Sequence, residues 1–159
     1  MPEITQQQDS RRIFIQILEE INDPKNIIVT MDVGFSYLDN TKLKVFNFGV
    51  TEASSTIISS ALALSGYTVW LYSMINFVTF RVHEFIRNAI VMHKANVKII
   101  GVKGSEKYKF LGFSHNLLWE DEEIEWLQKL MPCHKPKLEE VKEVILKEYA
   151  LKRPAYIRL

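Results

Sequence analysis

Hydrophobic residues along this chain are concentrated either in short segments of five or six residues or in longer stretches with helical spacing. The short runs predict strands at residues 27–31, 44–48, 68–72, 97–102 and 155–159. The longer stretches predict helices at residues 10–21, 52–65, 76–93, 120–130 and 138–151. Because strands separated by helices form βαβ units, we expect an α/β fold, a three-layer αβα arrangement with a mainly parallel sheet. The pattern does not give the order of the strands.

Turn and cap residues support these boundaries. Asp9 or Ser10 can cap the first helix, and Thr51 can cap the second. Pro132 and Pro136 bracket what we expect to be a turn before the last helix.

Length and composition fit one domain over residues 1–159, with residues 1–9 as a flexible polar arm. The formal net charge is +1, so charge favours neither nucleic acid nor an anionic membrane as a partner. The single cysteine, Cys133, cannot form an internal disulfide, and no signal peptide is evident, so we expect a cytoplasmic protein. The apolar stretches are shorter than a membrane span.

Ligands of open parallel sheets bind beyond the carboxyl ends of the strands. In the predicted fold four loops lie at that edge, at residues 32–40, 49–52, 73–77 and 103–115. The site residues should therefore come from these segments.

Glu52 opens the helix that follows the second predicted strand. A carboxylate in the first turn of a helix is stabilised by the helix dipole, so a purely structural role accounts for it. The alternative is a catalytic carboxyl in an apolar pocket, with a proton to share. The sequence alone leaves both roles open.

His115 is a second candidate. It lies three residues after Gly112, which lets the loop bend sharply at the ligand-binding edge. A lone loop histidine is more often a surface residue than a catalyst. Only the location of His115 in this loop makes it a candidate site residue.

Aromatic residues gather at the third strand-to-helix junction. Tyr72, Phe77 and Phe80 fit a hydrophobic core, but a flat heterocycle could also stack on one of them. Arg81 follows, either as a solvated surface residue or as a ligand for an anion.

Several kinds of site are not indicated. No pair of His, Cys, Asp or Glu has metal-ligand spacing, so we expect no metal site within this chain alone. The sequence contains no G-x-G-x-x-G, Walker loop or G-x-S-x-G elbow, which argues against a self-sufficient dinucleotide, nucleotide or acyl-transfer site.

Six segments in order carry a family resemblance. They are residues 45–52, 61–67, 72–87, 96–101, 112–115 and 153–159. The first ends in Gly-Val-Thr-Glu, the fifth reads Gly-Phe-Ser-His, and the last reads Arg-Pro-Ala-Tyr-Ile-Arg-Leu. Together they resemble the pyrimidine-binding domain of transketolases, from about residue 10 to the last residue.

This resemblance implies a transferase that uses thiamine diphosphate to move two-carbon ketol units between sugars. In that family a glutamate hydrogen-bonds the cofactor's pyrimidine and activates its thiazolium carbon. Glu52 would be that glutamate, and Phe77, with Phe80 as a rival, would stack on the pyrimidine. His115 would contact the donor sugar or assist proton transfer, and Arg81 would meet a substrate phosphate.

The resemblance also implies a partner. The family's Gly-Asp-Gly…Asn domain, which binds the diphosphate and Mg²⁺, has no counterpart here, so a separate transketolase-like subunit would supply it. We expect an α₂β₂ heterotetramer, or a homodimer when the chain is isolated. Its interface should use exposed apolar residues of the helices at 52–65 and 76–93.

Two departures leave the substrate open. Ala53 stands where the family has glutamine, and residues 103–110 replace an acidic or glycine-rich run. The alternatives are a subunit of another thiamine-diphosphate enzyme (deoxyxylulose-phosphate-synthase-like, or a 2-oxoacid dehydrogenase or decarboxylase), a non-catalytic interaction protein that kept the fold, and a flavodoxin-like binding module. The Ser114-His115 element favours transketolase over the 2-oxoacid decarboxylases.

Overall fold

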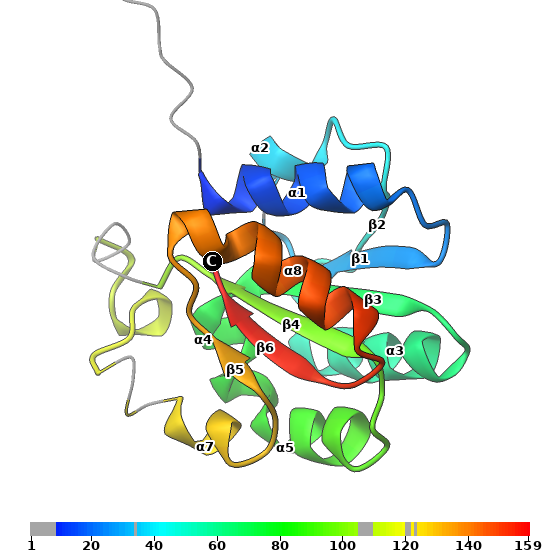
Figure 1. Cartoon of the computed structure of the whole chain (residues 1–159). Helices are drawn as coiled ribbons and strands as arrows, with labels where there is room; N and C mark the ends of the chain where they lie inside the picture. Colours follow the sequence, from blue (N-terminus) through cyan, green and yellow to red (C-terminus); the bar gives the residue numbers. More distant parts are fainter. Residues whose placement is uncertain (1–8, 34, 105–109, 120–121, 123) are drawn as a thin grey trace, which may run out of the picture.

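A six-stranded parallel sheet forms the centre of the molecule (Figure 1). The computed structural model describes all residues except 1–8, 34, 105–109, 120–121 and 123, so the predicted arm lies almost wholly outside the described residues. The strands are β1 (Asn26–Thr30), β2 (Lys44–Asn47), β3 (Thr68–Met74), β4 (Val97–Val102), β5 (Cys133–His134) and β6 (Ala155–Arg158). Their order is β2-β1-β3-β4-β6-β5, and within the described residues every pair is parallel.

Helical segments connect the strands. They are α1 (Ser10–Ile21), α2 (Phe35–Leu38), α3 (Glu52–Leu64), α4 (Ile75–Val78), η1 (Phe80–Val82), α5 (His83–Phe85), η2 (Ile86–Val91), η4 (Phe113–His115), α7 (Glu125–Gln128), η5 (Leu138–Glu140) and α8 (Val141–Ala150). The η segments are 3-10 turns, apart from η2, which is π-helical.

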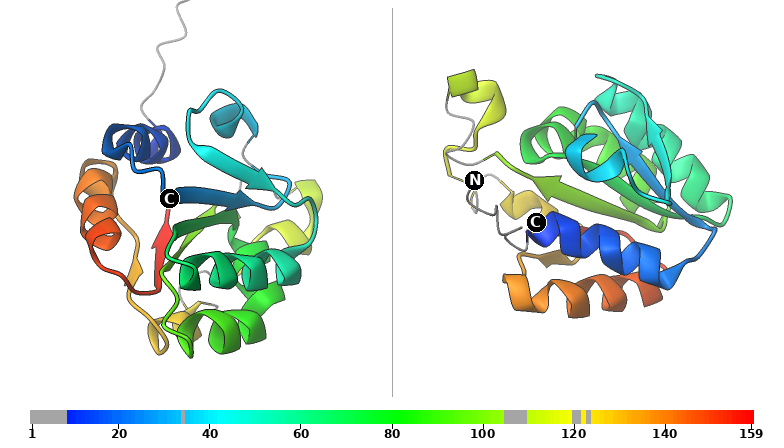
Figure 2. Two further views of the ribbon diagram at one scale, coloured as in Figure 1. Left: turned by 90° about the vertical axis from the view of Figure 1, so that its right-hand side faces the viewer. Right: turned by 90° about the horizontal axis from the view of Figure 1, so that it is seen from above.

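The helices cover both faces of the sheet, which gives three layers (Figure 2). Side chains of a strand point alternately to its two faces. Trp70 and Tyr72 of β3 therefore pack with Phe14 under α1 and α8, while Val69 and Leu71 pack on the opposite face, with side chains of α3, η2 and α7. The predicted α/β class and the αβα layers are confirmed.

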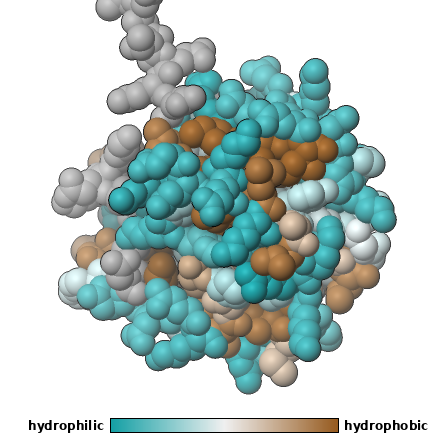
Figure 3. All heavy atoms as spheres, viewed as in Figure 1, coloured by the Kyte–Doolittle hydropathy of each residue, from teal (hydrophilic) through white to brown (hydrophobic). Residues whose placement is uncertain are grey.

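The outer surface of α1 and α8 is mostly hydrophilic, with smaller hydrophobic areas between the polar side chains (Figure 3). Across the described residues, no helix combines the length and the apolar character needed to cross a bilayer. The expected cytoplasmic location stays a prediction.

The prediction of one continuous helix at residues 76–93 is wrong. The segment is divided into α4, η1, α5 and η2. The first break falls at Thr79, whose φ of −122° and ψ of −77° are not helical. Its hydroxyl donates to the carbonyl oxygen of Ile75 at 2.6 Å, and such back-bonding by threonine bends helices.

Smaller differences lie near the C-terminus. The turn expected between Pro132 and Pro136 contains β5, whose two residues pair with β6. The helix predicted at 120–130 contains α7, and its predicted start lies mainly outside the described residues. The helix predicted at 138–151 begins with the 3-10 turn η5.

Candidate functional site

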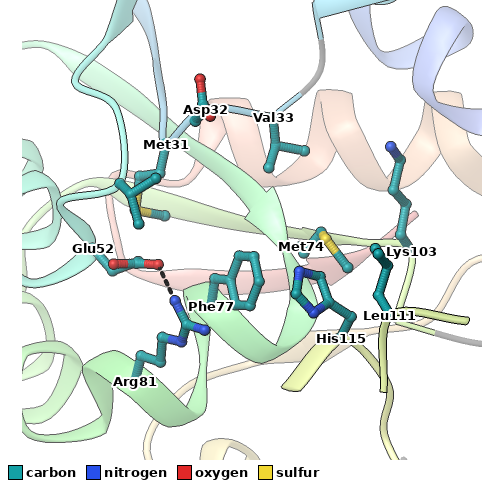
Figure 4. Close-up of a pocket in the computed structure, with 11 residues that line it drawn as sticks. Met31, Asp32, Val33, Glu52, Met74, Phe77, Arg81, Lys103, Leu111 and His115 are labelled. Atoms are coloured by element: carbon teal, nitrogen blue, oxygen red, sulfur yellow. Dashed lines mark hydrogen bonds and ion pairs between the residues drawn. The ribbon is translucent and has the colours of Figure 1, made fainter. Parts of the chain in front are cut away.

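The candidate site lies where the strand order reverses. From β1 the chain passes outward to β2, whereas from β3 it passes the other way to β4. The carboxyl ends of adjacent strands β1 and β3 therefore border a crevice, which is the usual ligand position in open α/β sheets. A cavity of about 660 Å³ opens there (Figure 4). Its lining residues are Met31, Asp32, Val33, Val50, Glu52, Met74, Phe77, Arg81, Lys103, Leu111 and His115. All four loops expected at this edge contribute to it.

Glu52 is held at the cavity by the turn that precedes α3. The side-chain oxygen of Asn47, at the end of β2, accepts from the backbone N–H groups of Asp32 and Gly49, both at 3.0 Å. Asn47 thereby joins the end of β1 to the turn that delivers Glu52. The carboxylate lies in the first turn of α3, as its structural role requires, but its side chain also lines the cavity and is only 13% exposed.

Arg81 engages that carboxylate. Its Nη1 donates to Glu52 Oε1 at 2.6 Å, and its guanidinium carbon lies 4.0 Å from the centre of the Phe77 ring. Glu52 therefore belongs to an ion pair and does not lie alone among apolar side chains. The Arg81 side chain is 43% exposed, so it remains in contact with solvent while it pairs with Glu52.

Phe77 and His115 face each other in the cavity. Their ring centres are 5.1 Å apart and their planes meet at 77°, an edge-to-face contact. Ser114 Oγ lies 2.8 Å from His115 Nδ1. Behind the rings, Asn76 Nδ2 donates to the carbonyl oxygen of Asn116 at 2.9 Å, which ties the two segments together. The structure thus brings Glu52, Phe77, Arg81 and His115 into one cavity.

Two of the aromatic residues lie elsewhere. Phe80 is 41% exposed and lines a separate depression with Arg81 and residues of α5, so it is not among the residues that line the cavity. Tyr72 is 1% exposed in the core, where its ring stacks on Phe14 at 6.3 Å. Of the two candidates for stacking on a heterocycle, Phe77 is the one in the cavity.

Sequence reasoning did not single out Met31, Met74 or Lys103, which also line the cavity. Lys103 has a left-handed φ of +59°, and Arg158 Nη2 donates to its carbonyl oxygen at 2.5 Å. A signal was present in the sequence, because Met31 ends a predicted strand, and Met74 and Lys103 lie in two of the loops expected at the ligand-binding edge.

The donor set fits a flat nitrogen heterocycle. Glu52 supplies a carboxyl group that is 13% exposed, Phe77 supplies an aromatic ring, and the apolar walls come from Met31, Met74 and Val50. Among the described residues, no three His, Cys, Asp or Glu side chains gather as they would around a metal ion. The pyrimidine of thiamine diphosphate therefore fits the side chains that are present.

The fold is similar to that of an α/β domain found in transketolases. No family model matches the chain. Over 156 residues it is 24% identical to a protein of Methanocaldococcus jannaschii named "Putative transketolase C-terminal section", covering 94% of this chain and 49% of that protein. The chain thus spans about half the length of this curated relative.

Solved structures share the fold. A split-gene transketolase, solved as an inactive beta4 tetramer, is 24% identical with a TM-score of 0.76 over 94% of this chain and 49% of that chain. Transketolase from Campylobacter jejuni is 16% identical, with a TM-score of 0.72 over 95% of this chain and 25% of that one. A Pichia stipitis transketolase mutant in complex with xylulose-5-phosphate is 15% identical, with a TM-score of 0.75 over 94% and 25%. These findings confirm the resemblance to a transketolase domain.

Proposed function

We propose that this chain, as a single domain, is the pyrimidine-binding subunit of a split transketolase-like enzyme. With a partner subunit that holds the diphosphate of thiamine diphosphate and Mg²⁺, it would transfer two-carbon ketol units between sugars. The observation that carries this proposal is the meeting of Glu52, Phe77 and His115 in one cavity at the strand-order reversal. The similarity to a protein named as a section of a transketolase, and to a split-gene transketolase, supports it.

Each side chain has a role that its surroundings suit. When bound, thiamine diphosphate supplies the reactive carbon that carries the two-carbon unit. Glu52 would share a proton with a pyrimidine ring nitrogen in a hydrogen bond, and Phe77 would pack against the ring. His115 moves a proton at a sugar hydroxyl. Because its Nδ1 lies 2.8 Å from Ser114 Oγ, we assign its Nε2 to the sugar.

Sugar phosphates are the proposed substrates, since the similar Pichia stipitis protein was solved with xylulose-5-phosphate. The phosphate contact predicted for Arg81 is not part of this proposal, because that guanidinium is paired with Glu52.

The proposed subunit interface uses α3 and the segments after β3. Several large apolar side chains are exposed there: Ile57 (46%), Ile58 (36%), Phe80 (41%) and Met92 (68%). Their burial between subunits would stabilise a homodimer, or an α₂β₂ heterotetramer with the diphosphate-binding partner.

Replacing Glu52 by glutamine tests the function. In the complex with a candidate diphosphate-binding subunit, we expect Glu52→Gln to lower kcat for ketol transfer from xylulose-5-phosphate by at least about 100-fold, because an amide cannot share a proton with the pyrimidine ring nitrogen as a carboxyl can. The mass of the complex, measured by light scattering, should not change.

Glu84→Gln is the matched control, since Glu84 is an exposed carboxylate on α5. It should leave kcat within about twofold of the unchanged enzyme, as expected for a surface substitution. If Glu52→Gln behaves like this control, the catalytic role is wrong.

The Glu52–Arg81 ion pair favours a second function, a non-catalytic subunit that kept the fold, because the carboxylate already has a partner. In that case Glu52→Gln would change neither the assembly nor the activity of the complex. The same kinetic comparison therefore separates the two functions.

A further inference from the structure

Arg81 already makes both contacts that the proposed function assigns to the pyrimidine. Its Nη1 donates to Glu52 Oε1 at 2.6 Å, and its guanidinium lies 4.0 Å from the Phe77 ring centre (Figure 4). Glu52 and Phe77 are 13% and 9% exposed, whereas Arg81 is 43% exposed. A half-exposed side chain therefore covers the two buried groups of the site.

The chemistry of the two occupants is alike. A guanidinium is a flat group with N–H donors along its edge, and it stacks on aromatic rings. An aminopyrimidine is also flat and hydrogen-bonds through its edge. With Arg81 in this position, Glu52 Oε1 is engaged and one face of Phe77 is covered, so a pyrimidine must displace the guanidinium.

We propose that Arg81 is a specificity-determining residue that competes for the cofactor's pyrimidine subsite. It occupies the Glu52–Phe77 pair in the free chain, and a flat nitrogen heterocycle that satisfies both groups replaces it. A ligand that offers only a charge, or only an apolar face, recovers one of the two contacts and displaces it poorly. This inference rests on the proposed function. It adds that Arg81 occupies the pyrimidine subsite when the cofactor is not bound.

The surroundings of Arg81 allow this exchange. Val78 and Val82 on either side of it are fully buried, so the backbone of the segment is anchored. The guanidinium can turn toward solvent without disturbing the core, because the cavity and the surface border it. At this exposure, the ion pair and the ring contact are each worth roughly a factor of two to five in an equilibrium.

The test uses a pyrimidine without the diphosphate, 4-amino-5-hydroxymethyl-2-methylpyrimidine, titrated into the full chain by NMR. Arg81→Met removes the guanidinium and keeps a long apolar side chain. We expect it to tighten binding roughly tenfold, because the internal competitor is lost. Arg81→Lys keeps the charge without the flat donor edge and should give an intermediate affinity.

Arg87→Met is the matched control. Arg87 is exposed and lines the depression beside Phe80, outside the cavity, so its replacement removes the same charge nearby. It should leave the affinity for the pyrimidine unchanged.

A second measurement follows the guanidinium directly. In the free chain the Arg81 N–H signals should exchange slowly with water, because Glu52 holds them. Saturation with the pyrimidine should make their exchange fast. Signals that stay protected at saturation would overturn the competition, whatever the affinities are.

Glu52→Gln separates the failure of this inference from the failure of the proposed function. It should weaken pyrimidine binding both alone and combined with Arg81→Met. If it does not, or if none of the chains binds the pyrimidine, the proposed function fails and the inference falls with it. If Glu52→Gln weakens pyrimidine binding but Arg81→Met binds the pyrimidine no tighter than the unchanged chain, the proposed function stands and Arg81 is not a competitor.

Discussion

At the scale of single residues, Asn76 links the two halves of the candidate site. It precedes Phe77, and its Nδ2 donates to the carbonyl oxygen of Asn116, the residue after His115, at 2.9 Å. The side chain is only 7% exposed, so water cannot easily replace this bond. The edge-to-face contact of Phe77 with His115 therefore depends on a carboxamide outside the cavity.

We predict that Asn76→Ala lowers the free energy of unfolding by about 1–3 kcal/mol, because it leaves the Asn116 carbonyl without its donor in a partly buried bond. Chemical denaturation followed by circular dichroism measures the change.

Asn88→Ala is the control for this prediction. Asn88 is exposed and makes surface hydrogen bonds to Glu84 and Arg87. Its replacement should change the unfolding free energy by less than about 0.5 kcal/mol. Equal stability of the two variants would contradict the linking role of Asn76.

At the scale of elements, most strands and helices follow from the apolar pattern. Residues 97–102 are apolar apart from Lys98 and Gly101, and β4 has these predicted bounds. The break at Thr79 was not predictable in this way, because it depends on a hydroxyl competing for a carbonyl, which apolar spacing does not record. β5 has two residues, too few for any period.

The site was predictable to a similar extent. Glu52, Phe77 and His115 follow predicted strands, so the rule for ligand edges was enough to find them. The pairing of Arg81 with Glu52 was not found, because it depends on the break after α4 and on the packing of α3 against η1.

A buried ionic cluster joins α8 to the sheet. Glu148 is fully buried on α8, where it accepts from Arg153 Nη2 at 2.8 Å and lies 2.9 Å from His134 Nε2. Lys98 of β4 is also fully buried and donates to the carbonyl oxygens of Leu151, at 2.7 Å, and Arg153. Burial lowers the pKa of Lys98 to about 8.

The pH dependence of stability should report this cluster. Burial alone would raise the pKa of Glu148, but hydrogen bonds from Arg153 and His134 outweigh it and hold that pKa below its ordinary value of 4.5. The carboxylate therefore stabilises the fold above pH 4.5, and this contribution is lost as the pH falls through the folded pKa.

We predict that Glu148→Gln destabilises the fold by about 1–3 kcal/mol at pH 7, because Arg153 and His134 lose the buried carboxylate that they contact. Its stability should also fall less steeply below pH 4.5 than that of the unchanged chain. Denaturant titrations from pH 7 to pH 3 measure both effects.

The control is Glu143→Gln, an exposed position on the same helix. It should leave the stability within about 0.5 kcal/mol and keep the acid-dependent slope. If the slope is equally steep in Glu148→Gln, the acid sensitivity arises elsewhere in the chain.

At the scale of the whole molecule, exposed apolar side chains on α3 and η1 lie on adjacent elements over one face of the sheet. Ile57 and Ile58 are 46% and 36% exposed on α3, and Phe80 is 41% exposed on η1, which packs against α3. The proposed subunit interface lies on this face, since exposed apolar side chains on adjacent elements are a common basis for association.

We predict that Ile57→Asp lowers the mass of the assembled protein, because a carboxylate would be buried at the interface without a partner. Sedimentation or light scattering measures the mass. Leu146→Asp is the control, since Leu146 is 40% exposed on α8, over the other face of the sheet. A mass unchanged by Ile57→Asp, or lowered only by Leu146→Asp, would move the interface away from α3.

The strand order also sets an order of assembly during folding. β6 lies between β4 and β5, although it follows both in the chain, and within the described residues β5 pairs with β6 alone. The β4–β6 pairing joins Gly101 to Arg158, 57 residues apart, and such distant contacts form slowly. The edge strand can join only after that closure, so we expect the β1–β3–β4 part of the sheet to be the folding nucleus and the β5 edge to be completed last.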